Sequence, residues 1–207
     1  MEIRWLGQST FELKTSTGTV ICDPYPGLFE SGSHLDPNTV VTMSRRGPPL
    51  ADMPETVHAF DRPGEYEAGS ISVRGVASPA GAPGQSRAVN TVFLIDAEGM
   101  TVCALGLPGT VPDATALQMM GPVDVLLVRT DGTTGLPMDQ RAAAVRTIEP
   151  RLVVPSGYDA STGAPGPALA SFLRQMGVKQ AEAQPRLAVS KASLPEDMKV
   201  IVLSPRA

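Results

Sequence analysis

The predicted elements change midway along the 207-residue chain from strands alone to alternating helices and strands, and this change limits the folds that the chain can adopt. Before the change, short runs of alternating or apolar residues separated by Gly and Pro turns predict strands at 2–6, 10–14, 19–22, 39–43, 56–59, 70–76, 92–96 and 100–105. After it, helices at 112–120, 139–149 and 167–176 alternate with strands at 123–128, 152–154, 187–190 and 199–203. Hairpins followed by right-handed crossovers predict a single α/β domain over residues 1–207, with two sheets covered by helices.

Three segments are expected to be loops. Residues 24–38 and 44–54 are rich in Pro, Gly and Ser, and the adjacent Pro48 and Pro49 remove hydrogen-bond donors that regular structure needs. Residues 77–88 are small and lack a hydrophobic anchor, so we expect them to be mobile.

Composition excludes several classes of protein. The net charge of −4 gives no general attraction to nucleic acid or anionic lipid. Two cysteines, Cys22 and Cys103, cannot frame a disulfide-rich fold and are expected to be core thiols. No apolar run is long enough to span a membrane and the first residues lack a signal-peptide core, so we expect a cytoplasmic protein.

Histidine is scarce. The chain contains only His34 and His58, each followed by an aspartate nearby, at Asp36 and Asp61. A metal site built from these groups is conceivable, because histidine and carboxylate both ligate zinc. The proline and glycines around His34 place it in a loop, however, and we favour a structural role for both histidines.

Several stretches, taken in order, resemble the metallo-β-lactamase-fold hydrolases, and most closely a small bacterial branch similar to ascorbate-6-phosphate lactonase-like proteins. The matching stretches are residues 5–11, 22–25, 40–44, 63–67, 90–91, 105–106, 124–127, 153–155 and 193–195. The resemblance implies an αβ/βα four-layer sandwich. It also implies metal-dependent hydrolysis, with metal ligands on loops at strand ends.

The family's ligand positions hold other residues in this chain. Gln8 stands where the first histidine is usual, and the His-x-His-x-Asp-His motif expected after Ser44 reads Arg45, Arg46, Gly47, Pro48, Pro49 and Leu50. The later positions hold Ala80, 104–107 (Ala-Leu-Gly-Leu) and Gly157. Apolar side chains offer zinc no donor, and two arginines would repel a dication. We therefore expect no metal, no other cofactor and no family reaction.

Other residues near this site are weaker candidates. Asp23 and Glu65 are possible catalytic carboxylates, although a turn cap and an ion pair are the better interpretations. Five residues are expected at the mouth of the pocket, where they could bind a small anion: Arg45, Arg46, Gln8, Ser156 and Tyr158.

These observations favour a degenerate metallo-β-lactamase-fold protein that binds a small anion or has an assembly or regulatory role. The alternative is a hydrolase that is metal-independent or weakly metal-dependent, with Asp23 or Glu65 as base and an arginine as electrophile. Homo-oligomer formation is a third expectation, and no nucleic-acid or membrane partner is expected.

Overall fold

The computed structural model describes residues 1–29, 35, 38–47, 53, 56–80, 89–131, 135–159 and 166–205. His34 lies outside these ranges, and so do residues 81–88 of the segment 77–88 that was expected to be mobile. None of the helices in the described ranges is long and apolar enough to cross a membrane.

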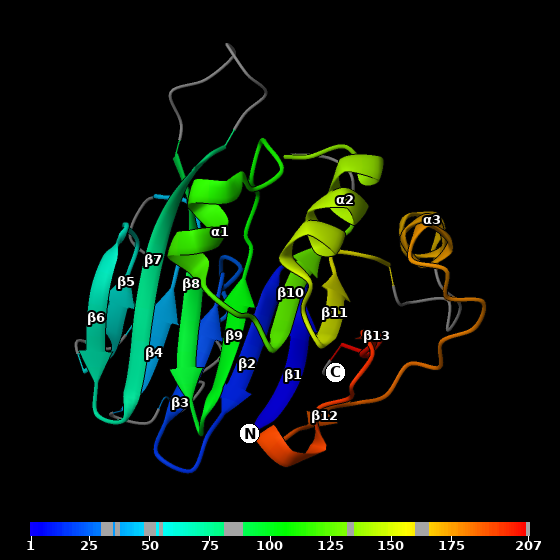
Figure 1. The fold of residues 1–207 in the computed structure, drawn as a ribbon. Helices are drawn as coiled ribbons and strands as arrows, with labels where there is room; N and C mark the ends of the chain where they lie inside the picture. Colours follow the sequence, from blue (N-terminus) through cyan, green and yellow to red (C-terminus); the bar gives the residue numbers. More distant parts are fainter. Residues whose placement is uncertain are drawn as a thin grey trace.

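Two mixed sheets form the body of the molecule (Figure 1). The first sheet has the order β12-β1-β2-β3-β4-β5. Its strands are β1 (Glu2–Gly7), β2 (Thr10–Lys14), β3 (Thr19–Cys22), β4 (Thr39–Thr42), β5 (His58–Phe60) and β12 (Leu187–Ala188). The predicted hairpin of β2 and β3 is confirmed, and β3, β4 and β5 then run parallel to one another.

The second sheet has the order β13-β11-β10-β9-β8-β7-β6. Its strands are β6 (Gly64–Ala68), β7 (Ile71–Pro79), β8 (Val89–Ala97), β9 (Met100–Ala104), β10 (Val125–Arg129), β11 (Leu152–Ser156) and β13 (Lys199–Val200). The β8–β9 hairpin turns through Glu98 and Gly99, both at positive φ, as a tight two-residue turn requires. From β9 onward the neighbours β10, β11 and β13 are parallel, which confirms the predicted crossovers.

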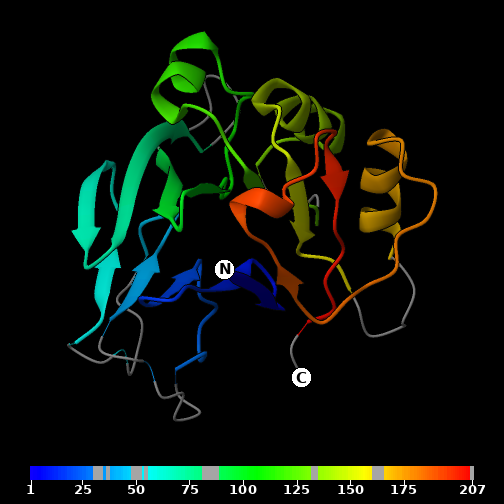
Figure 2. The ribbon, with the colours of Figure 1, turned by 60° about the horizontal axis from the view of Figure 1, so that its bottom comes forward.

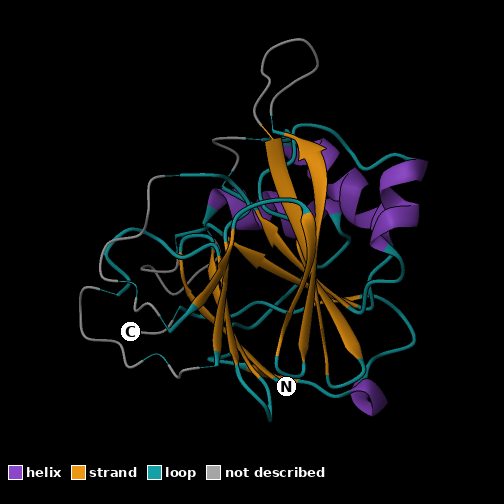
Figure 3. Ribbon diagram, turned by 90° about the vertical axis from the view of Figure 1, so that its left-hand side faces the viewer, coloured by secondary structure: helices purple, strands orange, loops and turns teal. Residues whose placement is uncertain are grey.

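The helices α1 (Ala114–Met120), α2 (Met138–Ile148) and α3 (Pro167–Gln175) lie on the same side of the molecule. Figure 3 shows the two sheets facing each other, with these helices outside the seven-stranded sheet, and Figure 2 shows α3 beside the β13 edge. The arrangement matches the predicted metallo-β-lactamase α/β sandwich. In the described part of the chain, a loop around Phe29 covers the six-stranded sheet and packs on Ile21 and Val41.

Successive side chains of each central strand of the second sheet point alternately into two hydrophobic cores, one between the sheets and one under the helices. In β8, Phe93 and Ile95 pack between the sheets, whereas Val92 and Leu94 pack against the helices with Phe172. A strand buried on both faces has to be apolar at nearly every position. This explains why β8 and β10 read as continuous apolar runs.

Two sequence predictions need correction. Strand β6 was not predicted, because its residues Glu65 and Glu67 are exposed on an edge strand and carry no apolar run. Strand β7 continues to Pro79 rather than ending at Val76, since its pairing with β8 extends to the Pro79–Val89 pair. Residues 77–79, expected in a loop, are therefore part of the sheet.

Candidate functional site

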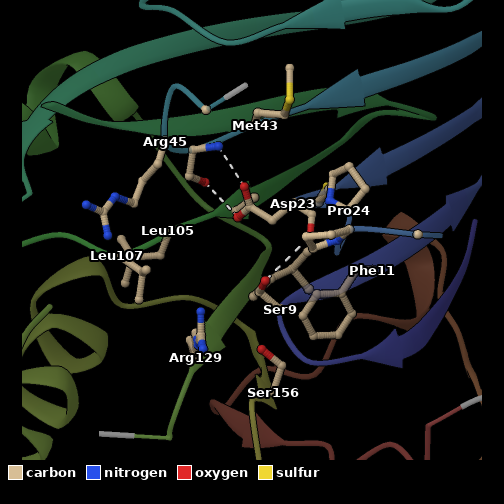
Figure 4. A pocket seen from close by; sticks show the side chains of 18 residues that line it. Ser9, Phe11, Asp23, Pro24, Met43, Arg45, Leu105, Leu107, Arg129 and Ser156 are labelled. Atoms are coloured by element: carbon tan, nitrogen blue, oxygen red, sulfur yellow. Dashed lines mark hydrogen bonds between the residues drawn. The ribbon is translucent and has the colours of Figure 1, made fainter. Parts of the chain in front are cut away.

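A cavity of about 450 Å³ opens where strands of both sheets end (Figure 4). Parallel strands bring their carboxyl ends to one edge of a sheet, so β3 and β4 meet there in one sheet and β9, β10 and β11 in the other. The lining residues come mainly from these ends and from β2: Ser9, Phe11, Cys22, Asp23, Pro24, Pro26, Gly27, Met43, Ser44, Arg45, Gly47, Ala104, Leu105, Gly106, Leu107, Leu127, Arg129 and Ser156.

Asp23, directly after β3, is held from several sides. Its backbone has φ 47°, and its carbonyl accepts a hydrogen bond from Thr10 Oγ1 at 2.7 Å. Its carboxylate accepts from Ser44, with the backbone N 2.6 Å from Oδ1 and the hydroxyl 2.7 Å from Oδ2. These bonds tie the end of β3 to the end of β4, so Asp23 orients the loops around the cavity.

Burial raises the pKa of Asp23 above its ordinary 3.8, although the hydrogen bonds from Ser44 and the charge of Arg129 oppose the shift. The folded state therefore binds this proton more tightly than the unfolded chain does. The contribution of Asp23 to stability is fully present below the unfolded pKa and is lost as pH rises through the folded pKa.

This shift gives a pH-dependent prediction for Asp23→Asn, which cannot titrate. The unfolding free energy of the wild type should fall relative to that of the variant as pH rises, by at most about 1.4 kcal/mol per pH unit. Urea unfolding between roughly pH 4 and pH 8 measures this, with Asp61→Asn, at a partly exposed carboxylate, as control. Parallel pH profiles for wild type and Asp23→Asn would contradict the prediction.

Arg129, the last residue of β10, lies at the opposite wall of the cavity. Its Nε donates to Asp131 Oδ2 at 2.8 Å, and its Nη2 bonds the same oxygen. The buried Arg141 on α2 lies behind this pair, with Nη1 3.6 Å from Asp131 Oδ1. Asp131 thus holds Arg129 in place from the side away from the cavity.

Gly157 makes room for the Arg129 side chain. A Cβ atom at Gly157 would lie 2.9 Å from Arg129 Cγ and 3.4 Å from Asp131 Cβ. A contact that short requires one of the side chains to move. A larger residue at position 157 would therefore displace the Arg129 side chain.

Arg45, the second cation of the lining, is exposed on the loop after β4. Figure 4 shows its side chain and that of Arg129 coming from different sheets, with Leu107 also on this side of the cavity. Ser156, at the end of β11, is buried, and its hydroxyl is turned toward the cavity in the same view.

Four of the residues predicted at the site lie outside the cavity lining. Arg46 points to Asp61, with 4.0 Å between Nε and Oδ2, and Gln8 contributes its backbone carbonyl to Trp5 Nε1 and Gly157 N. Tyr158 was wrongly expected at the mouth; its ring packs on Trp5 and its hydroxyl donates to the Leu203 carbonyl, so it belongs to the core.

Glu65 is the fourth. It lies on the edge strand β6, where its register partner is Arg74, and it is exposed. His58 is exposed on the edge strand β5, and His34 lies outside the described residues.

Arg129 was not predicted from the sequence. An arginine that directly follows the buried run of residues 125–128 was a usable signal, because a charged residue at the carboxyl end of a central parallel strand sits where ligands bind. The partner Asp131, two residues later, could have strengthened that inference.

The donor groups in the described cavity do not fit a zinc site. Its potential donors are the Asp23 carboxylate, which is bonded to Ser44, and the Cys22 thiol, which belongs to the hydrophobic core. Zinc requires thiolate, imidazole or carboxylate groups converging at close range. Among the described residues, no cluster of three or more His, Cys, Asp and Glu has that arrangement.

The family assignment follows from a profile described as beta-lactamase superfamily domain, which matches residues 2–156. The chain belongs to the metallo-β-lactamase superfamily. A comparison with curated proteins gave no match.

Solved structures share this superfamily fold. A protein of the metallo-β-lactamase superfamily from Thermotoga maritima is 24% identical, with 99% of each chain covered and a TM-score of 0.76. Igni18, a metallo hydrolase from Ignicoccus hospitalis, is 15% identical, with 91% of this chain and 99% of that chain covered and a TM-score of 0.64. YhfI from Bacillus subtilis is 11% identical, covering 97% and 95%, with a TM-score of 0.58. At these identities the likeness extends to the fold.

Proposed function

We propose that this member of the superfamily binds a small oxyanion in the cavity, with guanidinium groups as the positive charge, and does not carry out metal-dependent hydrolysis. The observation that carries the proposal is Arg129. Its side chain lies over Gly157, the position at which the family resemblance implies a metal-binding histidine. A hydrogen bond to Asp131 fixes the Arg129 side chain there.

Guanidinium is well suited to this role. It stays charged when partly buried, and its planar donors match the geometry of carboxylate and phosphate oxygens. Arg129 is held by its Nε and Nη2, and Arg45 adds a second positive charge to the lining from the other sheet. A ligand oxyanion between them would be attracted by both groups.

The alternative hydrolase finds less support. It needs a carboxylate that is free to accept a proton from substrate or water. Asp23 lines the cavity, but both of its oxygens accept hydrogen bonds from Ser44, and Glu65 lies on a distant edge strand. We therefore assign Asp23 a role in positioning the loops.

Anion binding is tested with isothermal titration calorimetry, using hexanoate and butyl phosphate as anions and 1-hexanol as the neutral comparison. We expect both anions to bind more tightly than the alcohol. Arg129→Gln should weaken binding of the anions by about 10-fold or more, because a hydrogen bond to a charged group contributes about 1.5–3 kcal/mol. Arg62→Gln, which removes an exposed arginine outside the cavity, is the matched control.

The proposal is overturned if neither anion binds, or if both Arg129→Gln and Arg45→Gln bind them as the wild type does. The metal part of the proposal has its own test, elemental analysis after expression in zinc-, iron- and manganese-supplemented medium. We expect no stoichiometric metal. One bound metal per chain that is lost in a variant of the cavity would refute a metal-free site.

A further inference from the structure

Much of the cavity wall beyond the arginines is apolar. Leu105 and Leu107 follow β9, Met43 follows β4, and Phe11 and Leu127 come from β2 and β10. Small-molecule sites are typically of roughly 300–1,000 Å³ and apolar, with a few polar groups that fix orientation. At about 450 Å³, this cavity has room for an apolar body in addition to an anionic group.

The charges around the cavity nearly balance. Asp131 lies between the guanidinium groups of Arg129 and Arg141, and these three groups together carry one excess positive charge. Arg45 is exposed, so water and salt screen its charge. Burial raises the pKa of Asp23 and thereby disfavours its charged form. A ligand with a single negative charge would neutralise the excess positive charge, whereas a dianion would leave an uncompensated charge in an apolar cavity, which is costly.

From these features we infer that the ligand is a monocarboxylate with an apolar chain, whose carboxylate binds between Arg129 and Arg45 and whose chain packs on Leu105, Leu107 and Phe11. This inference rests on the proposed function, since it names the ligand class of the same site. It adds two properties that anion binding alone does not require, namely a preference for one negative charge and a dependence on chain length.

The chain-length dependence is measured by calorimetry with butyrate, hexanoate and octanoate. Each added methylene should tighten binding by about fourfold until the apolar wall is covered, the factor that corresponds to burial of one methylene. Octyl phosphate, compared with octanoate at a pH where the phosphate is doubly charged, tests the charge preference. Octanoate should bind more tightly.

Variants separate the two ends of the ligand. Leu107→Asn should reduce the gain per methylene while leaving butyrate affinity close to wild type, whereas Arg129→Gln should weaken all chain lengths by a similar factor. Leu117→Asn, on α1 and outside the cavity, controls for the general effect of a partly buried leucine. Circular dichroism and thermal melting establish that each variant is folded.

The outcomes distinguish this inference from the proposed function. If anions bind through Arg129 with no dependence on chain length, or if octyl phosphate binds more tightly than octanoate, the inference is wrong and anion binding stands. If no anion binds, both are wrong. A chain-length gain that Leu107→Asn removes and Leu117→Asn keeps is the result we expect.

Discussion

Replacing Gly106 by alanine is expected to lower the free energy of unfolding by about 2–5 kcal/mol. Gly106 has φ 65°, and a Cβ there would lie 2.4 Å from Ser44 Cβ and 2.5 Å from Asn90 Oδ1. The left-handed backbone costs roughly 1–2 kcal/mol for an alanine, and overpacking adds about 1–3 kcal/mol. Urea unfolding monitored by Trp5 fluorescence measures the loss.

Gly99 provides the matched control. Its φ is 74°, close to that of Gly106, but a Cβ there would have nothing within 4 Å. Gly99→Ala should therefore lose only the backbone part, about 1–2 kcal/mol. Equal losses in the two variants would show that packing under Gly106 contributes nothing.

The contacts of Gly106 also explain why the variant should disturb the cavity. Ser44, which the new methyl group would meet, donates both hydrogen bonds that hold the Asp23 carboxylate. Asn90 accepts from Leu107 N at 2.7 Å and donates to the Leu105 carbonyl at 3.1 Å. Gly106→Ala should thus displace both loop ends that line the cavity, and Gly99→Ala should leave them in place.

Much of the fold could be predicted from the sequence because its signals are local. Alternating residues at 10–14, the turn at Glu98 and Gly99, and the helix that ends before Pro150 each depend on near neighbours. Strand β6 was not predicted because an exposed edge strand needs no apolar run, and because its position depends on pairing with β7. The end of β7 was missed for the same reason.

The site was harder to predict, since it is assembled from residues far apart in the sequence. Arg45 and Ser156 could be placed through the family resemblance, because they stand at or beside its ligand positions, and both line the cavity. The place of Arg129 in the site could be recognised only in the structure, where the space above Gly157 and the carboxylate of Asp131 orient its side chain. Tyr158, two residues beyond Ser156, faces the other way because its ring fills the core beside Trp5.

Replacing Arg141 by methionine should lower the free energy of unfolding by about 3–5 kcal/mol, the usual result of breaking a buried ion pair from one side. Arg141 is 3% exposed, and its Nε and Nη1 donate to the carbonyls of Leu136 and Arg129 at 2.6 and 2.8 Å. Methionine fills similar space but donates no hydrogen bond. Two buried carbonyls and the carboxylate of Asp131 would each lose a partner.

Arg146→Met is the control on the same helix. Arg146 is exposed, and its one described hydrogen bond, to the Gln175 carbonyl, is 3.3 Å long, so its loss should change stability by less than about 0.5 kcal/mol. A loss below about 1 kcal/mol for Arg141→Met would contradict the buried network.

Under conditions where Arg141→Met stays folded, its hexanoate affinity gives a second readout. With Arg141 absent, Asp131 is left to neutralise Arg129 alone, so the cavity loses its excess positive charge and anion binding should weaken even though Arg141 is not part of the cavity lining.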